Sequence, residues 1–269
     1  TDADSFTLAD ASTTWDDGVF LAPGESCQLG VQAVRQENGP YSANLLVTDA
    51  GSGETATATL SGTSSGFPST WIQISAADKH NCAVYSDDTG WCWGVNDYGE
   101  FGNGTTTDSD SPVEISGSAS WSMLSTSSNH TCGIKTDGTG WCWGLDDDQQ
   151  LGNGVGDTWQ MTPSPIAGGG FWKQTQGAIT AGRDQTCGIK IDGSGYCWGD
   201  DTYGQLGNGA TTGVQHSPQP ISGGGTWETI SAGRFFSCGV KTGGNGYCWG
   251  REVVGELGNG AITGDQGSG

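Results

Sequence analysis

The chain has 269 residues, of which 33% are apolar, 49 are glycine and 12 are tryptophan. Glycine at this frequency would break most helices, and the sparse apolar residues leave little surface for a helical core, so we expect an all-β, turn-rich fold. Thirty acidic and nine basic residues give a net charge of −21, which argues against nucleic-acid binding because phosphate backbones would be repelled. Membrane insertion is not expected either, since no apolar run approaches the roughly 20 residues that cross a bilayer.

The first 63 residues follow a pattern of their own. The segment from Leu21 to Cys27 reads L-A-P-G-E-S-C, and strands are predicted at Gln28–Val34, Tyr41–Thr48 and Thr55–Leu60. This order is similar to the immunoglobulin-like modules of bacterial surface proteins, which carry an L-x-P-G-x-[ST]-C turn and a Y-x-[AG]-x-L-x-[VI] strand. The resemblance implies a β-sandwich over residues 1–63, which is expected to be incomplete because a whole sandwich has roughly 100 residues.

After a linker predicted at residues 64–70, one sequence repeat occurs four times. Each copy has a Trp-led strand, a W-C-W-G or Y-C-W-G phrase and then a G-N-G phrase, and the second cysteines lie 50, 55 and 51 residues apart. The third copy carries four extra residues near Gln174 to Gly177. Short strands and glycine turns at a period of about 50 residues are typical of propeller blades. The Trp-led strands begin at Trp71, Trp121, Trp172 and Trp227, and the cysteine phrases are Trp91–Gly94, Trp141–Gly144, Tyr196–Gly199 and Tyr247–Gly250.

The copies resemble the regulator-of-chromosome-condensation (RCC1) repeat family. That family's motif has a strand ending in A-G, then H-[ST]-x-A-L, a D-G turn, a W-G and a G-Q-L-G-x-G; the first copy matches it at Ser75-Ala76, His80, Cys82–Val84, Trp93-Gly94 and Gly99–Gly104. The resemblance covers residues 71–260 and implies a β-propeller, usually of seven blades. The expected architecture is therefore all-β: a short immunoglobulin-like sandwich over residues 1–63, followed by four RCC1-like repeats over residues 71–269 that form an incomplete propeller.

Eight of the nine cysteines form four pairs with one spacing. If Thr136, Asp137 and Gly138 form a three-residue hairpin loop with Gly138 in the left-handed conformation, Cys132 and Cys142 fall directly opposite each other, within disulfide range. The same register predicts intra-repeat disulfides in every copy. The predicted pairs are Cys82/Cys92, Cys132/Cys142, Cys187/Cys197 and Cys238/Cys248.

Two alternatives for the cysteines are a metal site and reduced thiols packed as small apolar residues. Zinc favours cysteines two to four residues apart, so a C-x9-C spacing argues against metal. Disulfides are the preferred interpretation, and they place the protein in an oxidising compartment, outside the cell or on its surface. Cys27 has no partner in the repeats and is expected to be buried and free or bonded to a second chain.

Two histidines and two acidic loops are candidate catalytic or metal-binding sites. His80 and His130 align with Gln185 and Phe236 in the later copies, so this position is interpreted as a structural slot of the repeat and not as a catalytic base. The acidic loops at Asp146–Asp148 and Asp200-Asp201 could collect calcium, but they lack the spacing of a calcium loop, and solvated acidic surface is the preferred interpretation; no cofactor is predicted.

Asn103 and Asn129 begin N-x-T sequences and are candidate N-glycosylation acceptors.

These features are compatible with three functions. The preferred prediction is a secreted, non-enzymatic structural or adhesive module of an extracellular fibre or array, whose copies assemble as a homo-oligomer or polymer by sharing strands. The alternative is a soluble propeller module that recognises or inhibits a protein partner. Guanine-nucleotide exchange, the role of the family's nuclear member, is disfavoured by the charge of −21 and the paired cysteines. An enzyme is not predicted, since no catalytic constellation stands out in the sequence.

The strand-sharing hypothesis comes from the ends of the repeat region. Repeats one to three continue past the G-N-G phrase into P-x-x-I strands at Pro112–Ile115, Pro163–Ile166 and Pro218–Ile221, and the fourth does not. The segment upstream of Trp71 also lacks such a strand, so the first blade is expected to be short of it as well. Edge strands left open in this way could pair with another chain.

Overall fold

The computed structural model describes residues 70–117, 119–156, 158–260 and 267 with their side chains, and residues 6–8, 31–33, 39–48 and 55–64 as strand backbone. The chain divides into two compact units, residues 1–69 and 70–269. All of the regular elements in the described residues are strands. None of those residues form a helix long and apolar enough to span a bilayer.

The first unit contains two antiparallel strand pairs. Strand β1 (Phe6–Leu8) pairs with β2 (Val31–Ala33), and β3 (Gly39–Thr48) pairs with β4 (Thr55–Ser64) in a register that sets Thr48 opposite Thr55. Strands β2, β3 and β4 overlap the three segments that the sequence predicts, and β1 was not predicted. The L-A-P-G-E-S-C segment and Cys27 lie outside the described residues, so the immunoglobulin-like sandwich and the fate of Cys27 stay predictions.

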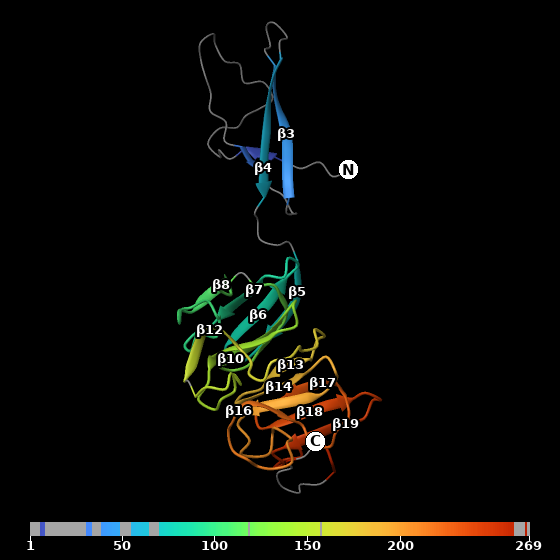
Figure 1. Ribbon diagram of the computed structural model, residues 1–269. Coiled ribbons are helices and arrows are strands. Elements are labelled where there is room, and N and C mark those ends of the chain that lie inside the picture. The colour runs from blue at the N-terminus through green and yellow to red at the C-terminus, as the bar shows by residue number, and fades with distance from the viewer. Residues whose placement is uncertain are drawn as a thin grey trace. The chain divides into compact units, whose positions relative to one another are not determined.

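The second unit consists of four antiparallel sheets, which we call blades 1 to 4, and Figure 1 shows them following one another in chain order from β5 to β19. Blade 1 comprises β5 (Trp71–Ala76), β6 (His80–Tyr85), β7 (Gly90–Gly94) and β8 (Ser109–Glu114); blade 2 comprises β9 (Trp121–Thr126), β10 (His130–Lys135), β11 (Gly140–Leu145) and β12 (Trp159–Pro165). Blade 3 comprises β13 (Ile179–Ala181), β14 (Gln185–Ile189), β15 (Gly195–Gly199) and β16 (Gln215–Pro220); blade 4 comprises β17 (Trp227–Ala232), β18 (Phe236–Lys241) and β19 (Gly246–Gly250). The first strands β5, β9, β13 and β17 lie next to one another in succession.

The hairpin of each blade has the register that its sequence predicts. In blade 2 the Lys135 amide donates to the Thr139 carbonyl at 2.9 Å, and Gly138 has a φ of 84°. A glycine at the third loop position favours this left-handed turn in blades 2 to 4, and in blade 1 Asp88 adopts it with a φ of 67°. Cys132 consequently pairs directly with Cys142.

The fourth strands correct one expectation. Each of blades 1 to 3 takes its outermost strand from the P-x-x-I segment that follows its own G-N-G phrase, so β8 pairs with β7 and blade 1 has four strands. The expectation that blade 1 lacks this strand was therefore wrong, because β8, which follows the G-N-G phrase of the same repeat, supplies the outer strand. Among the described residues, blade 4 has three strands.

The core lies between successive blades and is built from indole rings set against glycines. Trp121 and Trp143 of blade 2 are 1% and 0% exposed, and their ring centroids are 5.2 Å apart. A Cβ at Gly90 or Gly102 of blade 1 would lie 2.7 Å from one of these indoles, closer than real Cβ atoms approach. The abundance of glycine and tryptophan in the sequence therefore reflects one packing arrangement that is repeated along the unit.

Candidate interaction surfaces

Four disulfides stabilise the blades. Each predicted pair is joined across its hairpin, with Cα atoms 4.0 to 4.1 Å apart, so the cross-strand prediction agrees with the structure. The six cysteines of blades 1 to 3 are fully buried, whereas Cys238 and Cys248 of blade 4 are partly exposed. Disulfides of this density are typical of proteins from oxidising compartments.

The blades are also joined by a repeated backbone acceptor. The Glu100 carbonyl of blade 1 accepts hydrogen bonds from Trp143 Nε1 at 2.7 Å and from Thr131 Oγ1 at 2.9 Å, both in blade 2. Gln150 and Gln205 hold the same position at the next two junctions and accept from Trp198 with Thr186 and from Trp249 with Ser237. The second Trp of each W-C-W phrase is thus a structural residue in blades 2 to 4, and it is not available to a ligand.

The two repeat histidines are buried between blades. His80 Nε2 lies 2.7 Å from Thr131 Oγ1, and His130 Nε2 lies 2.9 Å from Thr186 Oγ1. Burial lowers the pKa of His80 to about 4; burial, together with the neighbouring His80, lowers the pKa of His130 to about 3. Both imidazoles are therefore neutral at physiological pH, and their contacts are those of residues that join blades.

The acidic loops form the solvated surface that the sequence suggested only in part: Asp147 is exposed and Asp148 is half-buried, whereas the other three carboxylates are buried. Asp146 and Asp201 are fully buried, because each carboxylate accepts the backbone N–H of the residue five positions later, Leu151 or Leu206, at 2.9 and 3.0 Å. Asn96 does the same for Phe101 in the first repeat. Among the described residues no group of three or more His, Cys, Asp or Glu side chains converges in a way that could hold a metal ion.

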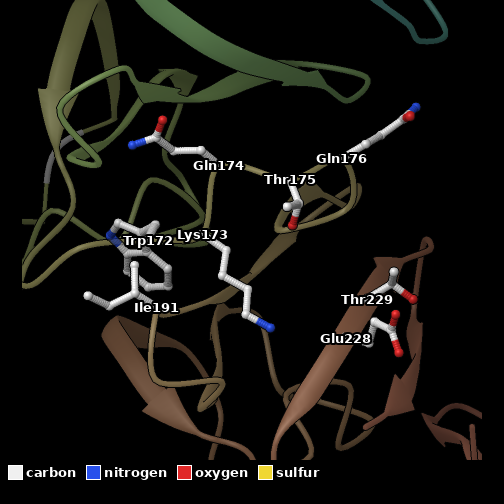
Figure 2. Close-up of a pocket in the computed structure, with 8 residues that line it drawn as sticks. All are labelled: Trp172, Lys173, Gln174, Thr175, Gln176, Ile191, Glu228 and Thr229. Carbon is white, nitrogen blue, oxygen red and sulfur yellow. The ribbon is translucent and has the colours of Figure 1, made fainter.

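The four-residue insertion in the third repeat shapes a pocket of about 570 Å³ (Figure 2). Trp172 forms an isolated bridge with Lys190, and the strand resumes only at β13, so the residues between them bulge outward. Lys173 extends toward β17, where its Nζ donates to the Trp227 carbonyl at 2.8 Å. The pocket is lined by Trp172, Lys173, Gln174, Thr175, Gln176, Ile191, Glu228 and Thr229, a set of amides, hydroxyls and opposite charges that suits a small polar group.

A second pocket, of about 290 Å³, lies where the first strands of all four blades end. Equivalent turns line it, and the residue at the rim changes from Asp78 in blade 1 and Ser128 in blade 2 to Arg183 and Arg234 in blades 3 and 4. The basic side of this opening lies on blades 3 and 4. Aligning the repeats position by position could have found this contrast from the sequence.

Three of the chain's four arginines gather around Phe235. The guanidinium carbons of Arg183, Arg234 and Arg251 lie 5.9, 4.6 and 5.3 Å from the centre of that ring, and Tyr203 packs edge-on against it. We call these five residues the arginine–aromatic patch. In a chain with a charge of −21 it is a local concentration of cations and aromatic surface, which can bind carboxylates and planar groups.

Acidic side chains border the arginine–aromatic patch. Arg183 Nε lies 3.7 Å from Asp184 Oδ1. Burial raises the pKa of Asp184 and of the nearby Asp148, and repulsion between these two carboxylates and Asp200 acts in the same direction. The patch therefore carries mixed charge, and a partner would have to compete with these internal carboxylates for the arginines.

The candidate glycosylation acceptors lie in different surroundings. Asn103 is half-buried, and its Oδ1 accepts from the backbone and hydroxyl of Thr105 at 3.0 and 2.8 Å. Asn129 is half-buried beside His130, and the Thr131 of its N-x-T sequence is fully buried at the blade junction. Both sites stay predictions.

The sequence matches the model of the regulator of chromosome condensation (RCC1) repeat at residues 87–134 and 192–240. Each match runs from the hairpin of one blade into the second strand of the next, so the unit of sequence joins two units of structure. Together with the four sheets, these matches show that the chain carries RCC1 repeats folded as RCC1-like propeller blades.

Solved structures show the same fold. Human WBSCR16 matches with a TM-score of 0.67 and 20% identity over 78% of this chain and 54% of its own. Yeast RCC1 (Prp20), crystallised bound to Kap60, matches with a TM-score of 0.65 and 17% identity over 77% of this chain and 50% of its own. Prp20p from Saccharomyces cerevisiae, studied for its binding to Gsp1p and histones, matches with a TM-score of 0.65 and 18% identity over 77% and 52%. This chain thus spans about half the length of the solved relatives that it matches.

Proposed function

We propose that the chain is an extracellular, non-enzymatic structural or adhesive module whose copies assemble with one another. The four disulfides support an oxidising location. The described blade residues serve chiefly to join one blade to the next, and the pocket shaped by the insertion offers groups suited to binding.

The outer edge of blade 4 carries this proposal. In blades 1 to 3 the carbonyls of Gly90, Gly140 and Gly195 accept the N–H of the P-x-x-I isoleucine at 2.9 to 3.0 Å, which seals the edge. In blade 4 the corresponding strand β19 has no partner strand beyond β18 among the described residues. An open edge of this kind pairs readily with a strand from another chain.

The chain itself reaches the start of this fourth-strand position. The Gly209 N–H donates to the Gly267 carbonyl at 2.8 Å, as Gly104 and Gly154 donate to Met161 and His216, residues of the fourth strands of blades 2 and 3. Gly267 therefore stands where a fourth strand would begin. In the proposed assembly, a strand from a neighbouring copy lies along β19 beyond this point and completes the sheet.

A strand peptide tests whether the edge of β19 accepts a partner. A fluorescent peptide that copies residues 214–222, the fourth strand of blade 3, should bind the chain saturably in an anisotropy titration, and a scrambled peptide should not. Sedimentation velocity of the chain over a wide concentration range should then show species larger than the monomer. A chain that stays monomeric and ignores the peptide contradicts the proposal.

The arginine–aromatic patch favours a second candidate function, a binding module for a protein that presents carboxylates. In this case an acidic peptide such as hexaglutamate should bind at low salt and be released as salt rises. The double substitution Arg183→Gln with Arg251→Gln should abolish that binding. Unchanged binding by the double variant would rule the patch out as the site.

A further inference from the structure

Each blade presents two different faces to its neighbours. We call the leading face the one that carries the first Trp of the repeat and the second Trp of the W-C-W or Y-C-W phrase. The trailing face is the one that carries the glycine at the start of the third strand and the first glycine of the G-N-G phrase. At each internal junction the two tryptophans of one blade pack on the two glycines of the blade before it.

The three internal junctions have nearly the same geometry. A Cβ added at any of the six trailing-face glycines would lie 2.4 to 2.7 Å from an indole atom of the next blade, and the six tryptophans are at most 2% exposed. The pairs are Gly90 with Trp121, Gly102 with Trp143, Gly140 with Trp172, Gly152 with Trp198, Gly195 with Trp227 and Gly207 with Trp249. Only a residue without a side chain leaves room for the indole, so glycine and tryptophan at these positions fit each other specifically.

The leading face of blade 1 presents the same tryptophans, and no described blade packs on it. Trp71 is 40% exposed, and Trp93 is partly exposed with its ring 5.6 Å from that of Trp71. Ile72 and Ile74 on the same strand are 55% and 61% exposed. Three apolar side chains so exposed within four residues of one strand mark a surface that is suited to burial against a partner.

The trailing face of blade 4 presents the complementary half. Gly246 and Gly258 hold the positions of Gly195 and Gly207, but a Cβ at either would meet no described atom within 4 Å. Glu256 is the blade 4 equivalent of Gln205, whose backbone carbonyl accepts an indole N–H at the junction between blades 3 and 4. Blade 4 therefore offers the two glycine positions and the backbone acceptor that a further pair of tryptophans would require.

We infer that two copies of this chain bind head to tail, with Trp71 and Trp93 of one copy packed on Gly246 and Gly258 of the other. In this contact the Trp93 indole N–H donates to the Glu256 carbonyl, as Trp143 donates to Glu100 within the chain. The inference rests on the proposed self-assembly and assigns to it a face-to-face contact, distinct from the strand pairing proposed at the edge of β19. A second copy is the occupant because the contact continues a junction that the chain already forms three times, and because both halves of it are present on one molecule. Such a contact is heterologous, so it extends into a ring or a filament.

Three variants isolate the two faces. Gly246→Leu fills the trailing face, and since no described atom lies within 4 Å of that position, the fold should tolerate it. Trp71→Ala removes the exposed indole of the leading face. Gly156→Leu is the matched control, because Gly156 is exposed and equally free of neighbours but lies away from both faces. Thermal melts should show that all three variants fold.

Sedimentation velocity of single variants and of their mixture provides the test. Wild type and Gly156→Leu should associate as concentration rises, whereas Gly246→Leu alone and Trp71→Ala alone should remain monomeric. An equimolar mixture of Gly246→Leu and Trp71→Ala should form a 1:1 dimer that grows no further, because each variant keeps the face that the other lacks.

Different results overturn different claims. If wild type stays monomeric at every concentration, both the proposed self-assembly and this interface are wrong. If wild type assembles and the two face variants assemble equally well, or if their mixture gives no dimer, the self-assembly stands and the head-to-tail interface is wrong.

Discussion

His80 and His130 occupy equivalent positions in blades 1 and 2, but only the Nδ1 atom of His130 has a hydrogen-bond partner among the described residues. His130 Nδ1 lies 2.8 Å from Ser127 Oγ, whereas the residue equivalent to Ser127 in blade 1 is Ala77, and His80 Nδ1 is buried without a partner among the described residues. An unsatisfied buried polar atom costs free energy that a single hydroxyl can recover.

Ala77→Ser should therefore stabilise the protein. The new hydroxyl would reach His80 as Ser127 reaches His130, and we expect a gain of about 1 kcal/mol in the free energy of unfolding. Chemical denaturation of the variant and of wild type measures it. In a His80→Gln background the gain should shrink, and an equal gain there would show that the histidine is not the cause.

The two buried histidines should make stability depend on pH. Their folded pKa values, about 4 and about 3, lie below the unfolded value of 6.5, so as pH falls from 6.5 the unfolded chain binds protons that the folded chain does not. The stability they contribute is present above pH 6.5 and is lost as pH falls toward 4, by up to about 1.4 kcal/mol per pH unit for each histidine.

The variant that tests this replaces His80 and His130 by Gln, the residue that blade 3 carries at this position as Gln185. Burial raises the pKa of Glu100 to about 6, so this group favours folding at acid pH, but it is common to both proteins and cancels in the comparison. Melting temperatures measured from pH 7.5 to 4.5 should fall more steeply for wild type than for the double Gln variant. Parallel curves would contradict the assignment.

At the scale of elements, the sequence predicts features that depend on residues within one repeat, such as the hairpin register. The C-x9-C spacing and a left-handed residue at the third loop position, Gly138 in blade 2 and Asp88 in blade 1, determine the hairpin register, and the structure has that register in all four blades. The blade 1 fourth strand was mispredicted because sequence order alone does not say whether β8 pairs backward with β7 or forward with the next repeat. The buried role of Asp146 was missed because its partner is a backbone amide, which leaves no mark in the sequence.

The candidate surfaces could likewise be predicted only in part from the sequence. The insertion near Gln174 was visible in the alignment of the repeats, but the pocket that it shapes depends on Glu228 and Thr229 of the next blade. The arginine–aromatic patch brings together turns that lie about 50 residues apart, and only the angle between blades determines that they meet at Phe235.

Removing one disulfide should destabilise the protein by about 3 kcal/mol in the chain-entropy model, because each bridge closes a short loop with a sequence separation of 10. The double substitution Cys187→Ala with Cys197→Ala tests this in blade 3. Urea denaturation of the variant and of wild type, each with and without reductant, separates the bridge from the packing of its sulfurs. If reductant leaves wild type unchanged, or if non-reducing peptide mapping joins Cys92 to Cys132, the assignment fails.

At the scale of the whole molecule, charge is the dominant feature. Thirty acidic residues against nine basic ones leave few opportunities for attraction between side chains, and three of the four arginines are concentrated in one patch. Like charges on the rest of the surface repel one another, which disfavours the compact state. The disulfides and the tryptophan–glycine junctions stabilise the fold against this repulsion.

Salt should therefore stabilise the protein. Screening shortens the reach of charge repulsion from about 30 Å at 0.01 M ionic strength to about 8 Å at 0.15 M, so the melting temperature should rise between about 10 mM and 500 mM NaCl, most steeply at the low end. The double substitution Asp110→Asn with Glu114→Gln removes two exposed charges from β8, and this variant should melt higher than wild type at 10 mM NaCl and nearly equal to it at 500 mM. Sucrose, which strengthens burial without screening charge, should raise both proteins equally. A melting temperature independent of NaCl would show that surface repulsion has no part in the stability of this chain.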